Sequence, residues 1–290
     1  MVVEVSMKIV FSRKGFDSSA GGVASPILPD RTLLSLPIPD PGSNITYDEL
    51  TRAGYPLGQI VDDLTHSKIT AHDKAHLDPD LEFEAYPRQH GWRPLFGQDG
   101  AAQGHLIHSE LKKGDLFLFF GWFRKTKFEN GHLQYRPGAP DLHVLFGWLQ
   151  VSSIYTGDRL GSQLPLWARY HPHHSRPCTN NNTIYMATEK FQINGQPIDL
   201  PGAGTFRRFR PELCLTAPGS SRRSEWHLPR WFYPEENKPP LSYHSRMTRW
   251  SLNGDYTLLR SVGRGQEFVL DTRHYPESID WVHQLIDGCR

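Results

Sequence analysis

The chain has 290 residues, of which 38% are hydrophobic and 12% aromatic, so it is long and apolar enough to bury a sizeable core. Its 32 Lys and Arg residues almost cancel its 31 Asp and Glu residues. This balance excludes a protein that attracts a polyanion through its overall field, and any contact with nucleic acid must come from local patches.

The three cysteines, Cys178, Cys214 and Cys289, lie far apart and form no C-x-x-C pair. A disulfide framework or a thiolate zinc site is therefore not expected, and we expect a cytoplasmic protein. No apolar run approaches 18 residues and the start lacks a signal-peptide core, so we expect no contact with a membrane. We expect one domain over residues 1–290, in which residues 1–6 are an extension if Met7 is the natural start.

The first predicted elements are a strand over residues 8–15 and an edge-like strand over residues 32–39, which contains prolines. Thr46 and Glu49 fit a capping box, which predicts the start of a helix. A second short helix is predicted over residues 56–64.

The middle of the chain predicts two strands, over residues 114–123 and 143–155, that share the triplet Phe-Gly-Trp. The shared triplet predicts that these strands pair, with glycines that permit a close approach or a bulge. Further strands are predicted over residues 183–191, 256–262 and 266–271. A last helix begins at Pro276 and stops at Gly288. The pattern predicts an α+β fold with a β-rich core, formed by a mixed or barrel-like sheet with peripheral helices and long Pro/Gly loops.

Histidine occurs 15 times, and several copies stand two residues from another potential metal ligand. These pairs are His76 with Asp78, Asp141 with His143, and His171 with His173. On an extended segment, residues i and i+2 point to the same side, so both members of a pair can reach one ion. Two histidines and one carboxylate form the facial triad of non-haem iron(II) oxygenases. The alternative for each pair is a polar loop or a histidine buried for packing.

Other motifs are weaker. Asp17 lies in a Gly- and Ser-rich loop after the first strand, whose N–H groups could cradle an anion. No segment matches a nucleoside-triphosphate loop or a dinucleotide fingerprint, so neither ATP nor NAD is expected. Two arginine patches, residues 206–210 (FRRFR) and 220–224 (SSRRS), suit contact with the phosphates and bases of nucleic acid. The alternative is a solvated charged face.

Longer blocks in the same order carry a resemblance. They include MKIVFSRKGFDSSAGG, HLDPDL, GWRPLFGQ, GAAQGHL, GDLFLFFGWFR, PGAPDLHVLFGWLQV, NNTIY, LSYH and SVGRGQEFVLD. Together they resemble the third nucleotide modification-associated domain family over essentially the whole chain. The resemblance implies an association with systems that alter nucleic-acid bases, in phages and in bacterial gene neighbourhoods, and is consistent with an iron-dependent activity. Separately, KKGDLFLFF and VLFGWLQV are similar to paired strands in PUA- and EVE-type barrels, which hold flipped bases.

The leading hypothesis is a metal-dependent enzyme, with Fe(II) as the expected ion and one or more ions bound, that oxidises a nucleobase, nucleotide or similar small molecule. Its predicted metal ligands are His76, Asp78, His105, Asp141, His143, His171 and His173. Asp17 and Asp80 are predicted catalytic carboxylates, and the predicted substrate-binding residues are Trp92, Arg93, Trp122 and Arg124. Two alternatives are a metal-free module that binds modified bases and a hydrolase that uses a divalent metal on Asp78 and Asp80.

Overall fold

The computed structural model describes residues 7–175, 180–235, 237–263 and 265–289. The predicted extension over residues 1–6 and Cys178 lie outside this part. The strands are β1 (Lys8–Arg13), β2 (Ser25–Ile27), β3 (Thr51–Arg52), β4 (Tyr55–Pro56), β5 (Leu95–Gln98), β6 (Leu116–Glu129), β7 (His132–Tyr135), β8 (Leu142–Thr156), β9 (Thr183–Ala187), β10 (Lys190–Ile193), β11 (Gln196–Pro201), β12 (Ala203–Thr205), β13 (Glu225–Pro229), β14 (Trp250–Asn253), β15 (Tyr256–Arg260) and β16 (Glu267–Asp271). The α-helices are α1 (Leu57–Thr65), α2 (Gly100–His108), α3 (Asp158–Ser162), α4 (Pro172–Ser175) and α5 (Glu277–Asp287).

A nine-stranded mixed sheet forms the centre of the described structure, with the main order β16-β1-β6-β8-β9-β5. Strands β2 and β7 also pair with β6, and β12 pairs with β8. Strand β1 is parallel to β6 and antiparallel to β16, so the two ends of the described chain meet in one sheet. The α+β prediction with a β-rich core is confirmed. In the described part of the chain the sheet stays open, so the barrel-like alternative is not realised.

The long strands β6 and β8 confirm the pairing predicted from the repeated Phe-Gly-Trp triplet. They run antiparallel, and the register shifts between Phe119 and Phe120, as expected for a bulge. Gly147 permits the predicted close approach, because a Cβ atom there would lie 2.5 Å from the Leu81 side chain and 2.9 Å from the Gly204 carbonyl. Residues 116–120 of β6 are completely buried, as is typical of a central strand covered on both faces.

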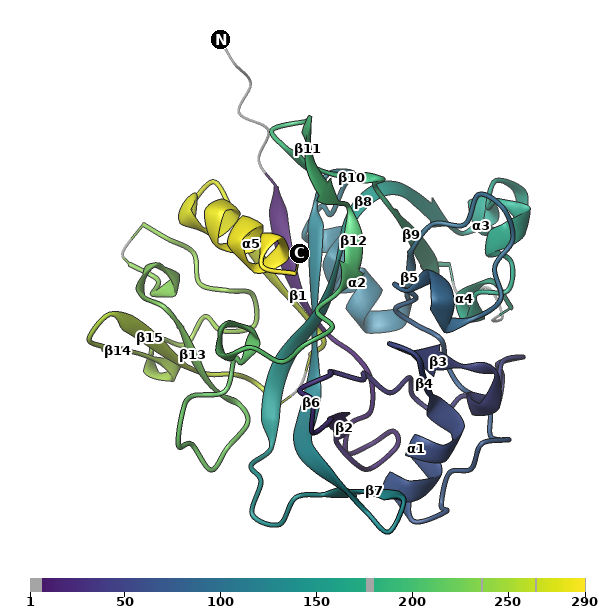
Figure 1. The fold of residues 1–290 in the computed structure, drawn as a ribbon. Helices are drawn as coiled ribbons and strands as arrows, with labels where there is room; N and C mark the ends of the chain where they lie inside the picture. Colours follow the sequence, from purple (N-terminus) through teal and green to yellow (C-terminus); the bar gives the residue numbers. More distant parts are fainter. Residues whose placement is uncertain (1–6, 176–179, 236, 264, 290) are drawn as a thin grey trace.

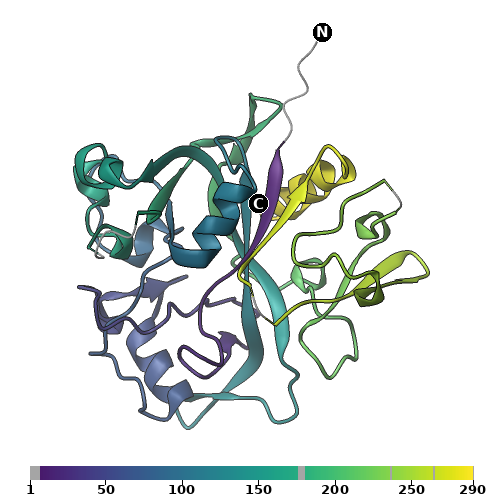
Figure 2. The same ribbon diagram turned by 180° about the vertical axis from the view of Figure 1, so that it is seen from behind.

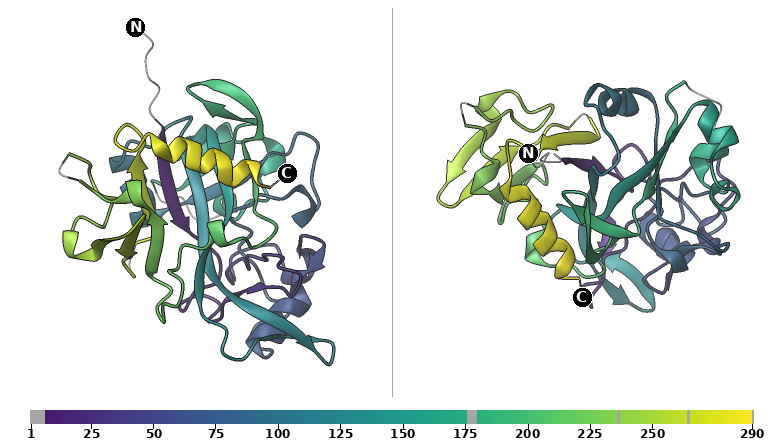
Figure 3. Two further views of the ribbon diagram at one scale, coloured as in Figure 1. Left: turned by 60° about the vertical axis from the view of Figure 1, so that its left-hand side comes forward. Right: turned by 90° about the horizontal axis from the view of Figure 1, so that it is seen from above.

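Two helices cover opposite faces of the central sheet. Helix α5 packs across β1 and β6 in the foreground of Figure 1, and the left view of Figure 3 shows it crossing these strands. Its buried residues Val282, Leu285 and Ile286 have the helical spacing that directs one apolar stripe into the core. Helix α2 lies on the other face, which Figure 2 brings to the front. No helix of the described residues is long and apolar enough to cross a membrane.

The N-terminal prediction is confirmed in part. Residues 57–65 form α1, and the capping box at Thr46 and Glu49 is present, although it opens only a single 3-10 turn over Tyr47–Glu49. The strand predicted over residues 32–39 is wrong. This segment makes only isolated bridges, because Pro37 and Pro39 lack the N–H groups that a strand ladder needs.

Candidate metal centre

Four segments that are distant in sequence meet at one place: residues 38–40, residues 76–80, β5 and helix α4. Mutual backbone hydrogen bonds between Asp80 and Leu95 hold the 78–80 segment against β5 (N–O distances of 2.9 and 3.0 Å). Helix α4 packs against β5 and β9 and presents His173. A hydrogen bond from His76 N to the Ile38 carbonyl (2.8 Å) brings residues 38–40 alongside. Tertiary pairing therefore assembles this site from residues more than 90 positions apart.

His76, Asp78 and His173 form a buried group in which one ligand atom from each residue lies within 4.8 Å of the others. Among the described residues, no other group of three or more His, Cys, Asp or Glu side chains meets this condition. The Nε2 atoms of both histidines lie 3.9 Å from Asp78 Oδ2. These separations are too long for hydrogen bonds and leave room for a cation between the three atoms.

The hydrogen bonds on the outer side of each ring determine where its proton lies. Nδ1 of His76 is 2.7 Å from Asp40 Oδ2, and a carboxylate oxygen only accepts, so Nδ1 carries a proton. Asn182 donates from Nδ2 to the His173 carbonyl (2.6 Å), so its Oδ1 must accept from His173 Nδ1 (2.7 Å). In the neutral rings both Nε2 lone pairs therefore face Asp78, as in metal sites whose histidines are oriented by outer hydrogen bonds.

The electrostatics of the group suit a cation. Burial lowers the pKa of His173 to about 4, so its imidazole is neutral at pH 7 and its Nε2 is free of a proton. Burial opposes ionisation of Asp78, but the neighbouring His171 makes the largest favourable contribution and holds the pKa of the Asp78 carboxyl well below the ordinary value. The site thus offers one negative carboxylate and two imidazole lone pairs, which is a set of donors typical of non-haem iron.

His171 is a fourth buried residue at this site. Its Nε2 lies 3.3 Å from Asp78 Oδ1, within ion-pair distance, although it forms no hydrogen bond of regular geometry with a described residue. Its Nδ1 accepts a hydrogen bond from the His173 N–H (3.3 Å), which places the proton of the neutral ring on Nε2. The geometry therefore favours His171 as a residue that positions Asp78, together with the Gly97 N–H that donates to Asp78 Oδ1 (2.7 Å).

Gly97 is required for the approach of α4 to β5. A Cβ atom at this position would lie 2.2 Å from Cδ2 and 2.4 Å from Cγ of His173. Contacts this short do not occur, so any side chain at residue 97 must displace the His173 ring.

A second polar cluster lies next to the candidate metal centre along the chain. Both carboxylate oxygens of the fully buried Asp80 accept from Arg88 (2.8 and 2.6 Å), and the Tyr170 hydroxyl also donates to Asp80. Tyr170 in turn accepts from Trp92 Nε1 (2.7 Å). Asp80, predicted as catalytic, and Trp92, predicted as substrate-binding, are thus joined in a satisfied network.

A third buried cluster was not predicted. Glu267 is completely buried and is held by Lys14 (3.1 Å) and Ser12 (3.0 Å) through Oε1. Gln98, the residue after Gly97, donates to the same oxygen (2.5 Å). Glu267 Oε2 has no hydrogen-bond partner among the described residues.

The remaining predicted ligands lie outside the candidate metal centre and have other partners. Asp141 pairs with Arg124 (2.6 Å) and lies 3.8 Å from Arg223. His143 accepts from Trp226 Nε1 (3.0 Å), and burial lowers its pKa to about 3. His105 contacts the Ser242 hydroxyl through Nε2 (3.0 Å).

The other predicted site residues also contact groups outside the candidate metal centre. Asp17 Oδ1 accepts from the N–H groups of Ser19 (2.7 Å) and Ala20 (2.8 Å) and closes its own turn. Arg93 donates to the Ala187 carbonyl. The guanidinium of Arg223 lies 4.2 Å from the centre of the Trp122 ring, and Arg124 is bound to Asp141.

Three residues of the site were absent from the sequence prediction: Asp40, Gly97 and Asn182. The run of three asparagines at residues 180–182 and the glycine in RPLFGQ are visible in the sequence, but neither carries a metal-ligand pattern. Their roles depend on neighbours that are distant along the chain.

Comparison with known proteins gives one finding. The family model described as nucleotide modification associated domain 3 matches residues 8–271, and every residue of the candidate metal centre falls inside this range. No curated protein and no solved structure gives a significant match.

Proposed function

The chain belongs to the nucleotide modification associated domain 3 family, and from this premise we propose that it is a metal-dependent enzyme that modifies a nucleobase or nucleotide. His76, Asp78 and His173 would hold the ion. The observation that carries the proposal is the pair of Nε2 lone pairs that face one oxygen of a buried carboxylate, with both rings fixed by outer hydrogen bonds.

Iron(II) is the ion that this set of donors fits best. Two imidazoles and one carboxylate without a thiolate match the facial triad, and iron bound there would supply oxidative chemistry with dioxygen. The protein's own contribution is to keep His173 neutral, to orient both rings and to exclude water by burial.

The structure supports the two alternatives less directly. A hydrolase on Asp78 and Asp80 would need Asp80 as a ligand, but Arg88 occupies both of its carboxylate oxygens. A metal-free base reader does not account for three potential ligands that converge in a buried place. The tests below distinguish it from an enzyme.

The first test is the metal content of the protein, purified without an affinity tag or chelator and then reconstituted anaerobically with iron(II). We expect near-stoichiometric iron in the wild type and its loss in His76→Ala and His173→Ala. Asp141→Asn is the matched control, because Asp141 is a sequence-predicted ligand that pairs with Arg124 instead. Circular dichroism would confirm that each variant is folded.

Protein that binds no metal after reconstitution would overturn the proposal, and so would iron that is retained by both histidine variants. If iron is bound, oxygen consumption in the presence of nucleosides, nucleotides and DNA distinguishes oxidation from hydrolysis. Product formation without oxygen uptake would refute the oxidative form of the proposal.

A further inference from the structure

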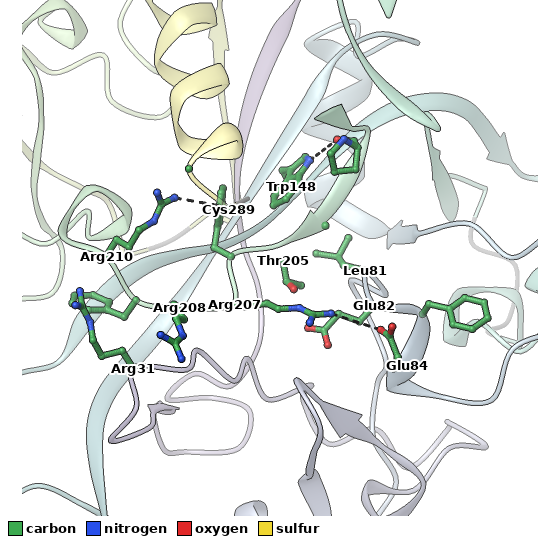
Figure 4. A pocket seen from close by; sticks show the side chains of 16 residues that line it. Arg31, Leu81, Glu82, Glu84, Trp148, Thr205, Arg207, Arg208, Arg210 and Cys289 are labelled. Carbon is green, nitrogen blue, oxygen red and sulfur yellow. Dashed lines mark hydrogen bonds and ion pairs between the residues drawn. The ribbon is translucent and has the colours of Figure 1, made fainter. Parts of the chain in front are cut away.

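A pocket of about 650 Å³ lies beside the candidate metal centre along the chain (Figure 4). Leu81 and Glu82 form part of its wall, and Leu81 follows Asp78 by only three residues. Three residues of extended chain span at most about 11 Å, so this wall is close to a predicted ligand of the ion. The volume falls within the range of small-molecule sites, roughly 300–1,000 Å³.

The opposite wall is basic. It comes from the FRRFR patch, which pairs with residues 31–33 through hydrogen bonds from Leu33 N to the Arg207 carbonyl (2.9 Å) and from Phe209 N to the Arg31 carbonyl (2.7 Å). Figure 4 shows Arg31, Arg208 and Arg210 on one side of the pocket and Arg207 reaching across toward Glu84. Backbone pairing therefore brings arginines from two distant segments to one pocket.

The arginines of the pocket outweigh its acidic residues. Glu82 is already engaged by Arg52 (3.6 Å) and by the Ala53 N–H (3.2 Å). Glu84 contacts Arg207 at 3.8 Å, but both side chains are largely exposed, so this ion pair is weak and can be exchanged.

The other three arginines keep charge available to a ligand. Arg31 and Arg208 form no ion pair with a described residue, although the charge of Arg208 contributes to the lowered pKa of Asp30. Arg210 donates to the Leu285 carbonyl at the end of α5 (2.9 Å), which leaves its charge without a carboxylate partner in the described structure.

An aromatic surface completes the pocket. Phe83, also part of the lining, is 56% exposed, although a side chain of this size is usually buried. It lies next to Glu84 in sequence and packs edge-on against Trp92 (5.6 Å between ring centres), which holds the ring in place. A supported, exposed aromatic ring near arginines is the combination that binds a base by stacking and a phosphate by charge.

We propose that this pocket binds a nucleoside phosphate unit of the substrate, with its phosphate on Arg207 and Arg208 and its base toward Phe83. The inference rests on the proposed function, because it gives the substrate class for the neighbouring candidate metal centre. The unit can be a free nucleotide or part of a single strand, since both present the same phosphate and base.

Calorimetric titration with deoxynucleoside 5′-monophosphates, the corresponding nucleosides, inorganic phosphate and a short single-stranded DNA tests this inference. We expect the monophosphates to bind more tightly than the nucleosides. Arg207→Ala combined with Arg208→Ala should weaken binding roughly 10- to 100-fold, because each charge-assisted hydrogen bond contributes substantially. Phe83→Ala should weaken binding of monophosphates but not of inorganic phosphate.

The matched control combines Arg159→Ala with Arg246→Ala, which removes the same charge from exposed positions outside the pocket and outside both arginine patches. It should change affinity less than about twofold. Tight binding of monophosphates identifies free nucleotides as a source of the ligand, whereas binding of the single strand alone identifies a polymer. The inference is overturned if no phosphate-bearing probe binds, if nucleosides bind as tightly as nucleotides, or if both double variants behave alike.

Iron content separates this inference from the proposed function. The Arg207/Arg208 double variant should retain wild-type iron while it loses nucleotide affinity. A wild-type protein that binds nucleotides through these arginines but binds no iron would refute the metal centre and leave the binding pocket supported.

Discussion

The role of Asp40 gives a sharp test of the candidate metal centre. Its Oδ2 accepts the His76 Nδ1–H at 2.7 Å, a charge-assisted bond that directs the His76 Nε2 lone pair toward Asp78. Outer partners of this kind typically contribute 10- to 100-fold to metal affinity, or about 1.4 to 2.8 kcal/mol. Asp40→Asn keeps an acceptor but removes the charge, so we expect about tenfold weaker iron binding. Asp40→Ala removes both the acceptor and the charge, so we expect about 100-fold weaker iron binding.

The assay is a competition titration of iron(II) against a chelator under anaerobic conditions. Asp48→Asn is the matched control, because Asp48 contacts His72 Nδ1 in the same way (3.2 Å) but His72 is 88% exposed. We expect less than a twofold change in this control. If Asp40→Ala binds iron with wild-type affinity, the reasoning that the outer hydrogen bond orients His76 is refuted.

Three further predictions concern the packing and charge of the interior. Gly97→Ala should displace His173 and abolish iron binding, as measured by elemental analysis. In the control Gly104→Ala the new Cβ meets nothing within 4 Å, so the metal content should be unchanged. Lys14→Met leaves the buried Glu267 without its cation, so it should lower the free energy of unfolding, measured by urea titration, by about 3–5 kcal/mol. The control Lys190→Met breaks the exposed Lys190–Asp199 pair and should lower the free energy of unfolding by less than about 1 kcal/mol. Equal losses in the two variants would refute the stabilising role of Lys14. Burial lowers the pKa of His244 from 6.5 to about 4, so as the pH falls His244 takes up a proton in the unfolded state before it does so in the folded state. The free energy of unfolding should therefore decrease as the pH drops from about 6.5 toward 4, by at most about 3 kcal/mol. His244→Gln should flatten this part of the pH profile, and an unchanged profile would contradict the assignment.

Much of the fold can be read from local patterns. The apolar runs that became β6 and β8, the capping box at Thr46 and the stripe along α5 each depend on interactions within a few residues or on one repeated triplet. The segment over residues 32–39 shows the limit, since its apolar residues suggested a strand while its prolines prevented one.

The sequence by itself determined that potential ligands stand in short-spaced pairs, including His76 with Asp78 and His171 with His173, although His173 lies on α4 and not on the extended segment that the spacing argument assumes. It did not determine which pairs meet. Asp141 and His143 have the same spacing as His76 and Asp78, yet Arg124 neutralises the first and Trp226 binds the second.

Only the tertiary structure decided the rest. The Asp80–Leu95 pairing, the packing of α4 against β5 and β9, and the absence of a side chain at Gly97 bring His173 to Asp78. Asp40 and Asn182 then orient the two rings. The physical reason is that spacing along the chain fixes the relative direction of two side chains only for a given local backbone, whereas distance across the fold is set by strand pairing and packing between segments that are remote in sequence.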